Sequence, residues 1–149
     1  MVDRVAVGRT AEAAVADVFR SIGYEVINLN ELVGNCPFAD LIATKVGLRL
    51  LVQVKGTTTA DGLFGTPPER VRALMAITEA LDCLPIYAFC HLTGTDPVIR
   101  FADAATVATL AESDEAAYDG VNRYHVNIGQ FPVDAKHVGQ LLEGPSAVA

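Results

Sequence analysis

The chain has 149 residues, 51% of them hydrophobic, which is the size of one domain with a single sizeable core, and no internal repeat indicates an array, so residues 1–149 are expected to form a single domain. No apolar run approaches the roughly 18 residues that a membrane helix needs, and Met1 leads into no signal-like segment, which predicts a cytoplasmic protein. The net charge of −7 argues against a tight, sequence-blind binder of duplex DNA.

Charge and cysteine content narrow these expectations. Residues 1–72 hold eight basic and eight acidic side chains, whereas residues 73–149 hold three basic and ten acidic ones, so any nucleic-acid surface must come from the first half. The cysteines Cys36, Cys83 and Cys90 are odd in number and share no metal-type spacing, which favours reduced thiols.

The N-terminal part predicts a helix, a strand and a loop. Apolar residues recur at three- and four-residue spacing over residues 9–22, and Gly23 supplies the helix stop. Residues 24–28 alternate as a strand. Residues 29–37 contain several breakers and are expected to form a loop.

A β-hairpin follows, and it brings polar side chains together. Two aliphatic runs, at residues 38–44 and 48–55, are joined by a short link that contains a glycine. Because strand side chains alternate, Gln53 and Lys55 share one face. Asp40 should lie opposite a residue between 51 and 53.

The remaining elements continue the alternation of helices and strands. In chain order, we expect a glycine-rich mobile loop over residues 56–65, a helix over residues 67–83 with a capping box at Thr66, strands over residues 85–92 and 98–101, a helix capped by Asp103 that ends near residue 112, an acidic loop over residues 113–120, a strand over residues 122–128, a helix over residues 133–142 and a frayed tail from residue 143.

Four residues form the candidate site. Glu12 lies at the edge of the apolar stripe of the first helix, and we expect it to approach Asp40, Gln53 and Lys55 on the hairpin. A simpler interpretation makes Glu12 a first-turn acid favoured by the helix dipole. The other three side chains could likewise form an ion pair at a sheet edge with an amide neighbour.

The element order and these residues resemble the PD-(D/E)xK nuclease superfamily, in particular its restriction-endonuclease-like and Holliday junction resolvase-like members. The resemblance covers about residues 8–92 and implies an α/β fold, an αβββαβ core with a mixed central sheet flanked by helices. By this resemblance, Asp40 matches the metal-ligating Asp of the family and Gln53 matches the second acid of the motif. Lys55 matches the motif lysine, and Glu12 matches the acid on the preceding helix. Pro37 is three residues from Asp40 rather than adjacent, and Gln53 replaces the usual acid.

The chemistry of phosphodiester hydrolysis fits this assignment. Mg²⁺ or Mn²⁺ can neutralise the developing negative charge and supply hydroxide near neutral pH. The expected ligands are Asp40, the Gln53 amide oxygen, the Val54 carbonyl and Glu12, the last directly or through water. Lys55 would orient or deprotonate the attacking water, or stabilise the phosphate charge. The sequence therefore predicts a metal-dependent DNA endonuclease, with structure-selective cleavage as its resolvase-like form.

Partners follow from the same hypothesis. Thr57 and Thr58 in the glycine-rich loop and Arg70 and Arg72 in the next helix are candidate DNA contacts, although all four also suit a solvated surface. Cleavage of two strands needs two sites and predicts a homodimer, with the acidic C-terminal half as its contact. Two alternatives remain open: a nuclease-fold protein that lost activity through Gln53 and binds nucleic acid or protein, and an acidic immunity or antitoxin protein.

Overall fold

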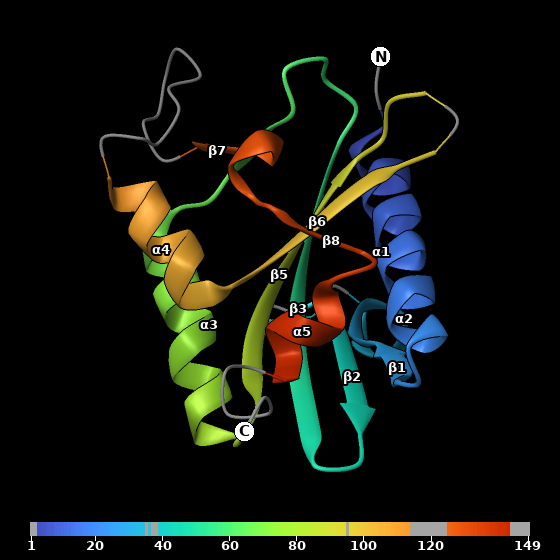
Figure 1. The fold of residues 1–149 in the computed structure, drawn as a ribbon, viewed down its shortest axis with the longest axis vertical. Coiled ribbons are helices and arrows are strands. Elements are labelled where there is room, and N and C mark those ends of the chain that lie inside the picture. Colours follow the sequence, from blue (N-terminus) through green and yellow to red (C-terminus); the bar gives the residue numbers. More distant parts are fainter. Residues whose placement is uncertain (1–2, 35, 37–38, 95, 114–124, 144–149) are drawn as a thin grey trace.

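The computed structural model describes residues 3–34, 36, 39–94, 96–113 and 125–143. A six-stranded sheet lies at the centre with helices on both faces, and a two-stranded sheet lies at one end (Figure 1). The strands are β1 (Glu25–Asn28), β2 (Leu41–Lys45), β3 (Leu48–Thr57), β4 (Leu63–Gly65), β5 (Leu84–His91), β6 (Val98–Asp103), β7 (His125–Asn127) and β8 (Val133–Asp134). The helices are α1 (Arg4–Ser21), α2 (Leu29–Val33), α3 (Pro68–Ala80), α4 (Ala104–Glu112), the 3-10 helix η1 (Ile128–Gln130) and α5 (Val138–Glu143).

The large sheet has the order β1-β2-β3-β5-β6-β8 and is mixed. β3 and β5 run parallel at its centre, connected through α3, and the other neighbours are antiparallel. The predicted hairpin is confirmed: Leu41 pairs with Val52, and Gly47 in the turn has φ 81°, a conformation that favours glycine. The predicted α/β fold with a mixed sheet between helices is therefore confirmed.

Each face of the sheet has its own apolar core, because strand side chains alternate between faces. α1 and α5 cover one face, where the buried side chains include Val15, Phe19, Leu41, Leu50, Val52, Phe101 and Val138. α3 and α4 cover the other, where they include Leu51, Val71, Tyr87, Phe89, Val107 and Val126. Figure 1 shows α1 on the opposite side of the sheet from α3 and α4. The strand β3 contributes to both cores and carries the candidate site at its C-terminal half.

Two N-terminal expectations need correction. α1 begins at Arg4, five residues before the predicted start, because the Asp3 carboxylate caps it by accepting from the N–H groups of Val5 and Ala6. The predicted loop over residues 29–37 contains the helix α2. Asn28 caps α2, since its side chain accepts from the Glu31 N–H at 3.1 Å.

The segment after β3 is more ordered than a mobile loop. β3 continues to Thr57, and residues 63–65 form β4, which pairs with β7. The intervening turn is held by His91, whose Nε2 lies 2.6 Å from the Thr59 carbonyl, and by Asn127, which donates to the Asp61 carbonyl at 2.7 Å. The capping box predicted at Thr66 is wrong, because Pro67 occupies the N-cap and no side chain caps α3.

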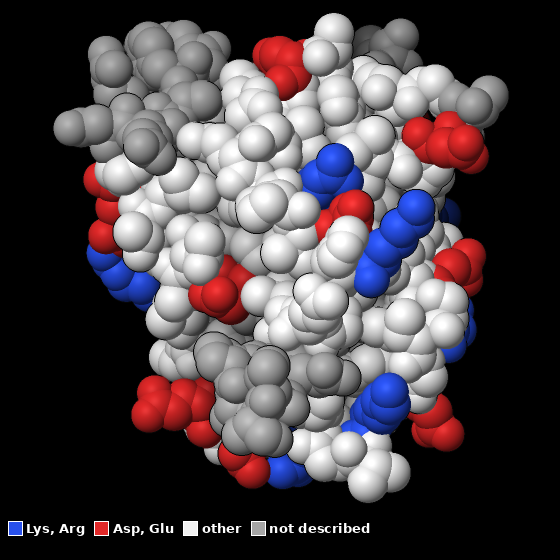
Figure 2. All heavy atoms as spheres, viewed as in Figure 1, with Lys and Arg blue, Asp and Glu red and all other residues white. Residues whose placement is uncertain are grey.

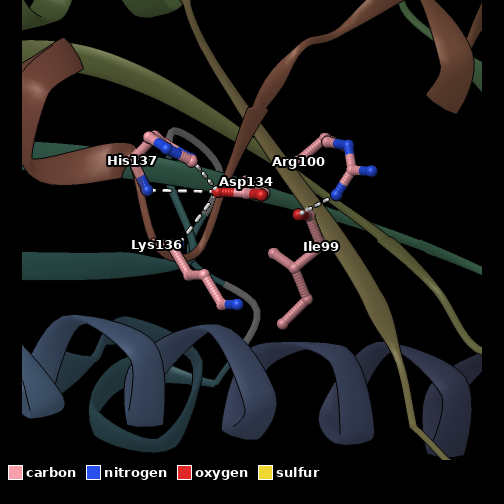
Figure 3. A network of polar contacts seen from close by, with 5 residues as sticks. All are labelled: Ile99, Arg100, Asp134, Lys136 and His137. Atoms are coloured by element: carbon pink, nitrogen blue, oxygen red, sulfur yellow. Dashed lines mark hydrogen bonds and ion pairs between the residues drawn. The ribbon is translucent and has the colours of Figure 1, made fainter.

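The helix predicted over residues 133–142 begins only at Val138, because Asp134 ends the preceding strand in a turn (Figure 3). The Asp134 Oδ1 accepts from the backbone N–H groups of Lys136 and His137 at 3.0 and 3.1 Å and lies 2.6 Å from the His137 Nδ1. Val133 pairs with Phe101, so β8 becomes the sixth strand of the sheet. Part of the predicted 122–128 strand is confirmed as β7, whereas residues 122–124 and most of the predicted acidic loop lie outside the described residues.

Within the described ranges, no helix combines the length and apolar character required to cross a bilayer. On the face that carries α5, Figure 2 shows basic and acidic side chains scattered among uncharged ones, with no gathering of one sign. That face therefore offers no strongly basic surface for a polyanion.

Candidate active site

Asp40 lies where β2 begins, beside the middle of β3. Its backbone N–H donates to the Val52 carbonyl at 3.0 Å, and Val52 is also the partner of Leu41, so Asp40 lies beside Val52, within the predicted range of residues 51 to 53. Its carboxylate Oδ2 accepts from the Val54 N–H at 2.7 Å. Because the N–H and C=O of one strand residue point to the same side, the Val54 carbonyl also faces the Asp40 side of β3. The aspartate side chain thus replaces β2 as the partner of this part of β3.

Glu12 reaches Asp40 through two asparagines. Its Oε1 accepts from Asn28 at 3.0 Å and its Oε2 accepts from Asn30 at 3.1 Å. The same Asn30 nitrogen donates to the Asp40 Oδ1 at 2.9 Å. The expected approach of Glu12 to Asp40 is therefore present. Its expected approach to Gln53 and Lys55 is wrong, because α1 covers the opposite face of the sheet from these two side chains.

The electrostatics of Glu12 follow from this crowded position. Burial raises the pKa of its carboxyl group above the ordinary 4.5, and the negative charge of Asp40 acts in the same direction. The hydrogen bonds from Asn28 and Asn30 oppose the shift because they favour the charged form. Two acids this close to each other would gain from a nearby cation.

Gln53 and Lys55 share the sheet face covered by α3, as expected from their spacing. Both are half-buried, and their neighbours on β5 are Tyr87 and Phe89. Burial lowers the pKa of the Lys55 ammonium from its ordinary 10.5; Asp40 opposes this shift and Arg70 adds to it. The Lys55 ammonium therefore lies within electrostatic range of both the Arg70 guanidinium and the Asp40 carboxylate.

Tyr87 is a member of this site that sequence reasoning missed. It pairs with Gln53 across the parallel strands and is 2% exposed. Burial, with a contribution from Asp40, raises the pKa of its hydroxyl group to about 12. The tyrosine therefore stays neutral at physiological pH and keeps its hydroxyl hydrogen available for donation.

A groove of about 840 Å³ opens beside the acidic pair along α1 and α2. Glu12, Asn30 and Asp40 line it, and so do three arginines of α1: Arg4, Arg9 and Arg20. Arg20 forms a surface ion pair with Asp17 at 3.7 Å. Arg4 and Arg9 are exposed and make no ion pair with any residue in the described ranges. The groove thus combines two acids at one position with basic side chains around them.

The four predicted DNA contacts are not brought to one place. The Thr57 hydroxyl is engaged with the Thr59 hydroxyl at 2.9 Å, and Thr58 is exposed. Arg70 lies in the first turns of α3 within electrostatic range of Lys55. Arg72 instead forms an ion pair with Glu112 of α4, on the outside of the helix pair.

Some of the missed residues carried a signal in the sequence. Asn28 followed three residues later by Glu31 has the spacing of a helix N-terminus, which predicts α2 and therefore places Asn30 on a helix. Nothing in the spacing of Tyr87, Arg4 or Arg9 relates them to Asp40, because these contacts depend on the packing of α1 and β5 against β3.

The oxygen donors present suit a hard divalent cation. Mg²⁺ is typically bound by one or two carboxylates while it keeps several waters. Glu12 and Asp40 supply two carboxylates, and the Val54 carbonyl faces the same side. Across the part of the chain that the structure describes, no three acidic, histidine or cysteine side chains gather as a metal site. Glu12, Asp40 and the Val54 carbonyl could therefore hold Mg²⁺ only in a water-rich shell with two anionic ligands, and the Gln53 amide would have to reach this ion from the other face of the sheet.

The strand order, the parallel β3-α3-β5 unit and α1 on the opposite face define a restriction-endonuclease-like fold. A solved structure with a similar fold is that of Hjc from Archaeoglobus fulgidus, described as a Holliday junction resolvase from an archaeal hyperthermophile. The TM-score is 0.59 at 14% sequence identity, and the match covers 89% of this chain and 95% of that chain. No protein-family model and no curated protein matches the sequence. At this identity the likeness shows the fold alone.

Proposed function

We propose that the protein is a metal-dependent DNA endonuclease with a preference for branched DNA, and that it acts in the cytoplasm. The observation that carries the proposal is the convergence of Glu12 and Asp40 on one amide nitrogen, with the Val54 N–H and the half-buried Lys55 beside Asp40. The fold shared with a Holliday junction resolvase supports the same class of reaction. Two acids and a strand carbonyl can hold a divalent metal that generates hydroxide, and a lysine beside them can stabilise the phosphate charge.

Each residue has a distinct role in the proposed reaction. Bound Mg²⁺ or Mn²⁺ would neutralise phosphate charge and lower the pKa of water. Asp40 is the main anionic ligand, Glu12 adds the second negative charge, and Gln53 and Val54 supply neutral oxygens. Lys55 donates hydrogen bonds to the attacking water or the phosphate, and burial strengthens this interaction because fewer waters compete.

The groove along α1 provides a path for the DNA strand. Arg4 and Arg9 contact phosphates on either side of the scissile bond in this proposal, and Arg70 contacts the strand from the α3 side. The many uncharged and acidic surfaces elsewhere keep non-specific duplex binding weak. We also propose a homodimer, because each chain carries one such site and cleavage of two strands needs two. Light scattering at working concentration, with and without DNA, measures this directly.

A second candidate function is favoured by one observation: the site holds two acids and an amide where a third acid would be usual for the resembled family. In this alternative the protein binds branched or nicked DNA without cutting it. Gln53→Glu separates the two candidates, because it adds a charged oxygen of nearly the same shape. Cleavage by this variant combined with no cleavage by the wild type would favour the binding protein.

The deciding experiment is a cleavage assay on plasmid, single-stranded and four-way-branched DNA with Mg²⁺, Mn²⁺ or EDTA. Wild type should cut the branched substrate with either metal and not with EDTA, and Asp40→Ala should be inactive. Asp96→Ala is the matched control, because it removes an exposed aspartate with no ion pair in the described ranges. Equal cleavage by Asp40→Ala and wild type would show that the site is wrongly assigned.

A further inference from the structure

Asn30 touches both acidic side chains of the candidate site with one nitrogen. Its Nδ2 lies 3.1 Å from the Glu12 Oε2 and 2.9 Å from the Asp40 Oδ1. Glu12 belongs to α1 and Asp40 to the start of β2, so the two acids come from separate elements. Among the hydrogen bonds of the described residues, Asn30 is the side chain that links these two acids directly.

The orientation of the Asn30 amide is fixed by its other end. The Asn30 Oδ1 accepts from the Cys36 N–H at 2.8 Å, so the NH₂ group must face the carboxylates. A flipped amide would lose this bond and set its oxygen against two negative groups. The helix that carries Asn30 is itself attached to the site, because the Leu29 N–H donates to the Asp40 carbonyl at 2.9 Å.

All four carboxylate oxygens of the pair accept a hydrogen bond from a fixed donor. Asn28 and Asn30 donate to Glu12, and Asn30 and the Val54 N–H donate to Asp40. Each carboxylate oxygen has a second lone pair, which stays available for a cation. The shared donor also offsets the repulsion between two acids held close together.

We propose that Asn30 is a positioning residue that joins Glu12 and Asp40 into one cation-binding pair. The inference rests on the proposed function, because it assigns a role toward the metal of that same site. Hydrogen-bond partners behind metal ligands typically change metal affinity by about 10- to 100-fold. A purely structural asparagine on α2 would change stability and leave the affinity of the folded protein for the cation unchanged.

The test is a Mn²⁺ titration of the full chain without DNA, in which the electron paramagnetic resonance signal of free Mn²⁺ measures how much of the ion is bound. Asn30→Ala should weaken Mn²⁺ binding by about 10-fold or more. Asn127→Ala, which removes an asparagine on β7 in the two-stranded sheet, should leave it unchanged. Unaltered binding by folded Asn30→Ala would overturn the proposal. Failure of wild type to bind Mn²⁺ would instead overturn the metal site itself.

A double variant shows whether Asn30 acts through the acids. In a Glu12→Ala background, Asn30→Ala should weaken Mn²⁺ binding less than it does in wild type, because one of its two acceptors is gone. Equal effects in both backgrounds would contradict a link between the two acids.

Asn30→Asp tests the same link through folding. It keeps an acceptor for the Cys36 N–H but replaces the shared donor by an oxygen of a third carboxylate. Without metal its melting temperature should fall below that of wild type, and saturating Mn²⁺ should raise it by more than it raises wild type. An Asn30→Asp variant that melts like wild type in EDTA would show that Asn30 does not join the acids.

Discussion

Gly56 marks a close approach of α1 to the central strand β3, and replacing it tests how the fold positions Glu12. A Cβ atom at Gly56 would lie 2.8 Å from the Ala11 Cβ and 3.4 Å from the Val7 Cγ1. Carbon atoms in favourable contact are about 3.5–4.0 Å apart, so Gly56→Ala requires α1 to withdraw by roughly 1 Å. The Ala11 methyl group has no rotamer by which to avoid the new atom, so the helix backbone must move.

The expected cost follows from this overlap. Overpacking of this kind costs about 1–3 kcal/mol, and a chain of this length loses about 2–4 °C of melting temperature per kcal/mol, which gives a fall of about 2–12 °C. Glu12 follows Ala11 directly and moves with the helix. Because a displacement near 1 Å can lower a rate by about 100-fold, cleavage should fall more steeply than stability.

Thermal unfolding followed by circular dichroism, together with the Mg²⁺ cleavage assay, measures both effects. Gly8→Ala is the control on the same helix: its Cβ would meet nothing within 4 Å, and the gain in helix propensity should raise stability by about 0.8–1.0 kcal/mol. Adding Ala11→Gly to Gly56→Ala should restore the position of Glu12 and part of the activity. Wild-type stability and activity of Gly56→Ala would refute the close packing of α1 on β3.

Three further predictions concern single side chains of the site and its surroundings. Burial lowers the pKa of Lys55 from 10.5, so its charge reduces the free energy of unfolding below the lowered pKa, and this penalty disappears as the pH rises to 10.5. Lys55→Met should therefore melt above wild type at pH 7, lose that advantage near pH 10.5, and have no cleavage activity; a lower melting temperature at pH 7 would contradict the burial. Gln53→Glu should bind Mn²⁺ more tightly than wild type and keep or increase cleavage, especially at low Mg²⁺, whereas weaker binding would remove Gln53 from the site. Arg9→Ala should weaken DNA binding and reduce the slope of the logarithm of affinity against the logarithm of salt concentration by about one. Arg72→Ala removes an exposed ion pair worth at most about 1 kcal/mol and should leave DNA binding unchanged.

The hairpin was predictable because its determinants are local. Alternating aliphatic residues set both strands, Gly47 set the turn, and the register placed Asp40 beside Val52, within the predicted range of residues 51 to 53. The same local rules predicted α1, α3, β5, β6 and α4, since each has a strong period or an Asp cap. Glu12 was recognisable from its position at the edge of a buried stripe.

The rest depended on contacts between distant segments. The strand β8 forms because Val133 pairs with Phe101 and Asp134 turns the chain, which overrides the helical pattern of the following residues. The role of Asn30 depends on α1, α2 and the Cys36 N–H meeting at one point. Tyr87 joins the site only through the parallel pairing of β5 with β3.

The central claim is that Asp40 and Glu12 hold the metal of a DNA endonuclease. The most direct test measures cleavage of a four-way-branched DNA and the number of bound Mn²⁺ ions in the same titration. We predict that cleavage by wild type rises in proportion to the occupancy of one saturable Mn²⁺ site per chain, and that Asp40→Ala loses both together. Cleavage that persists in EDTA, or Asp40→Ala that binds Mn²⁺ and cuts like wild type, would contradict the assignment of this site.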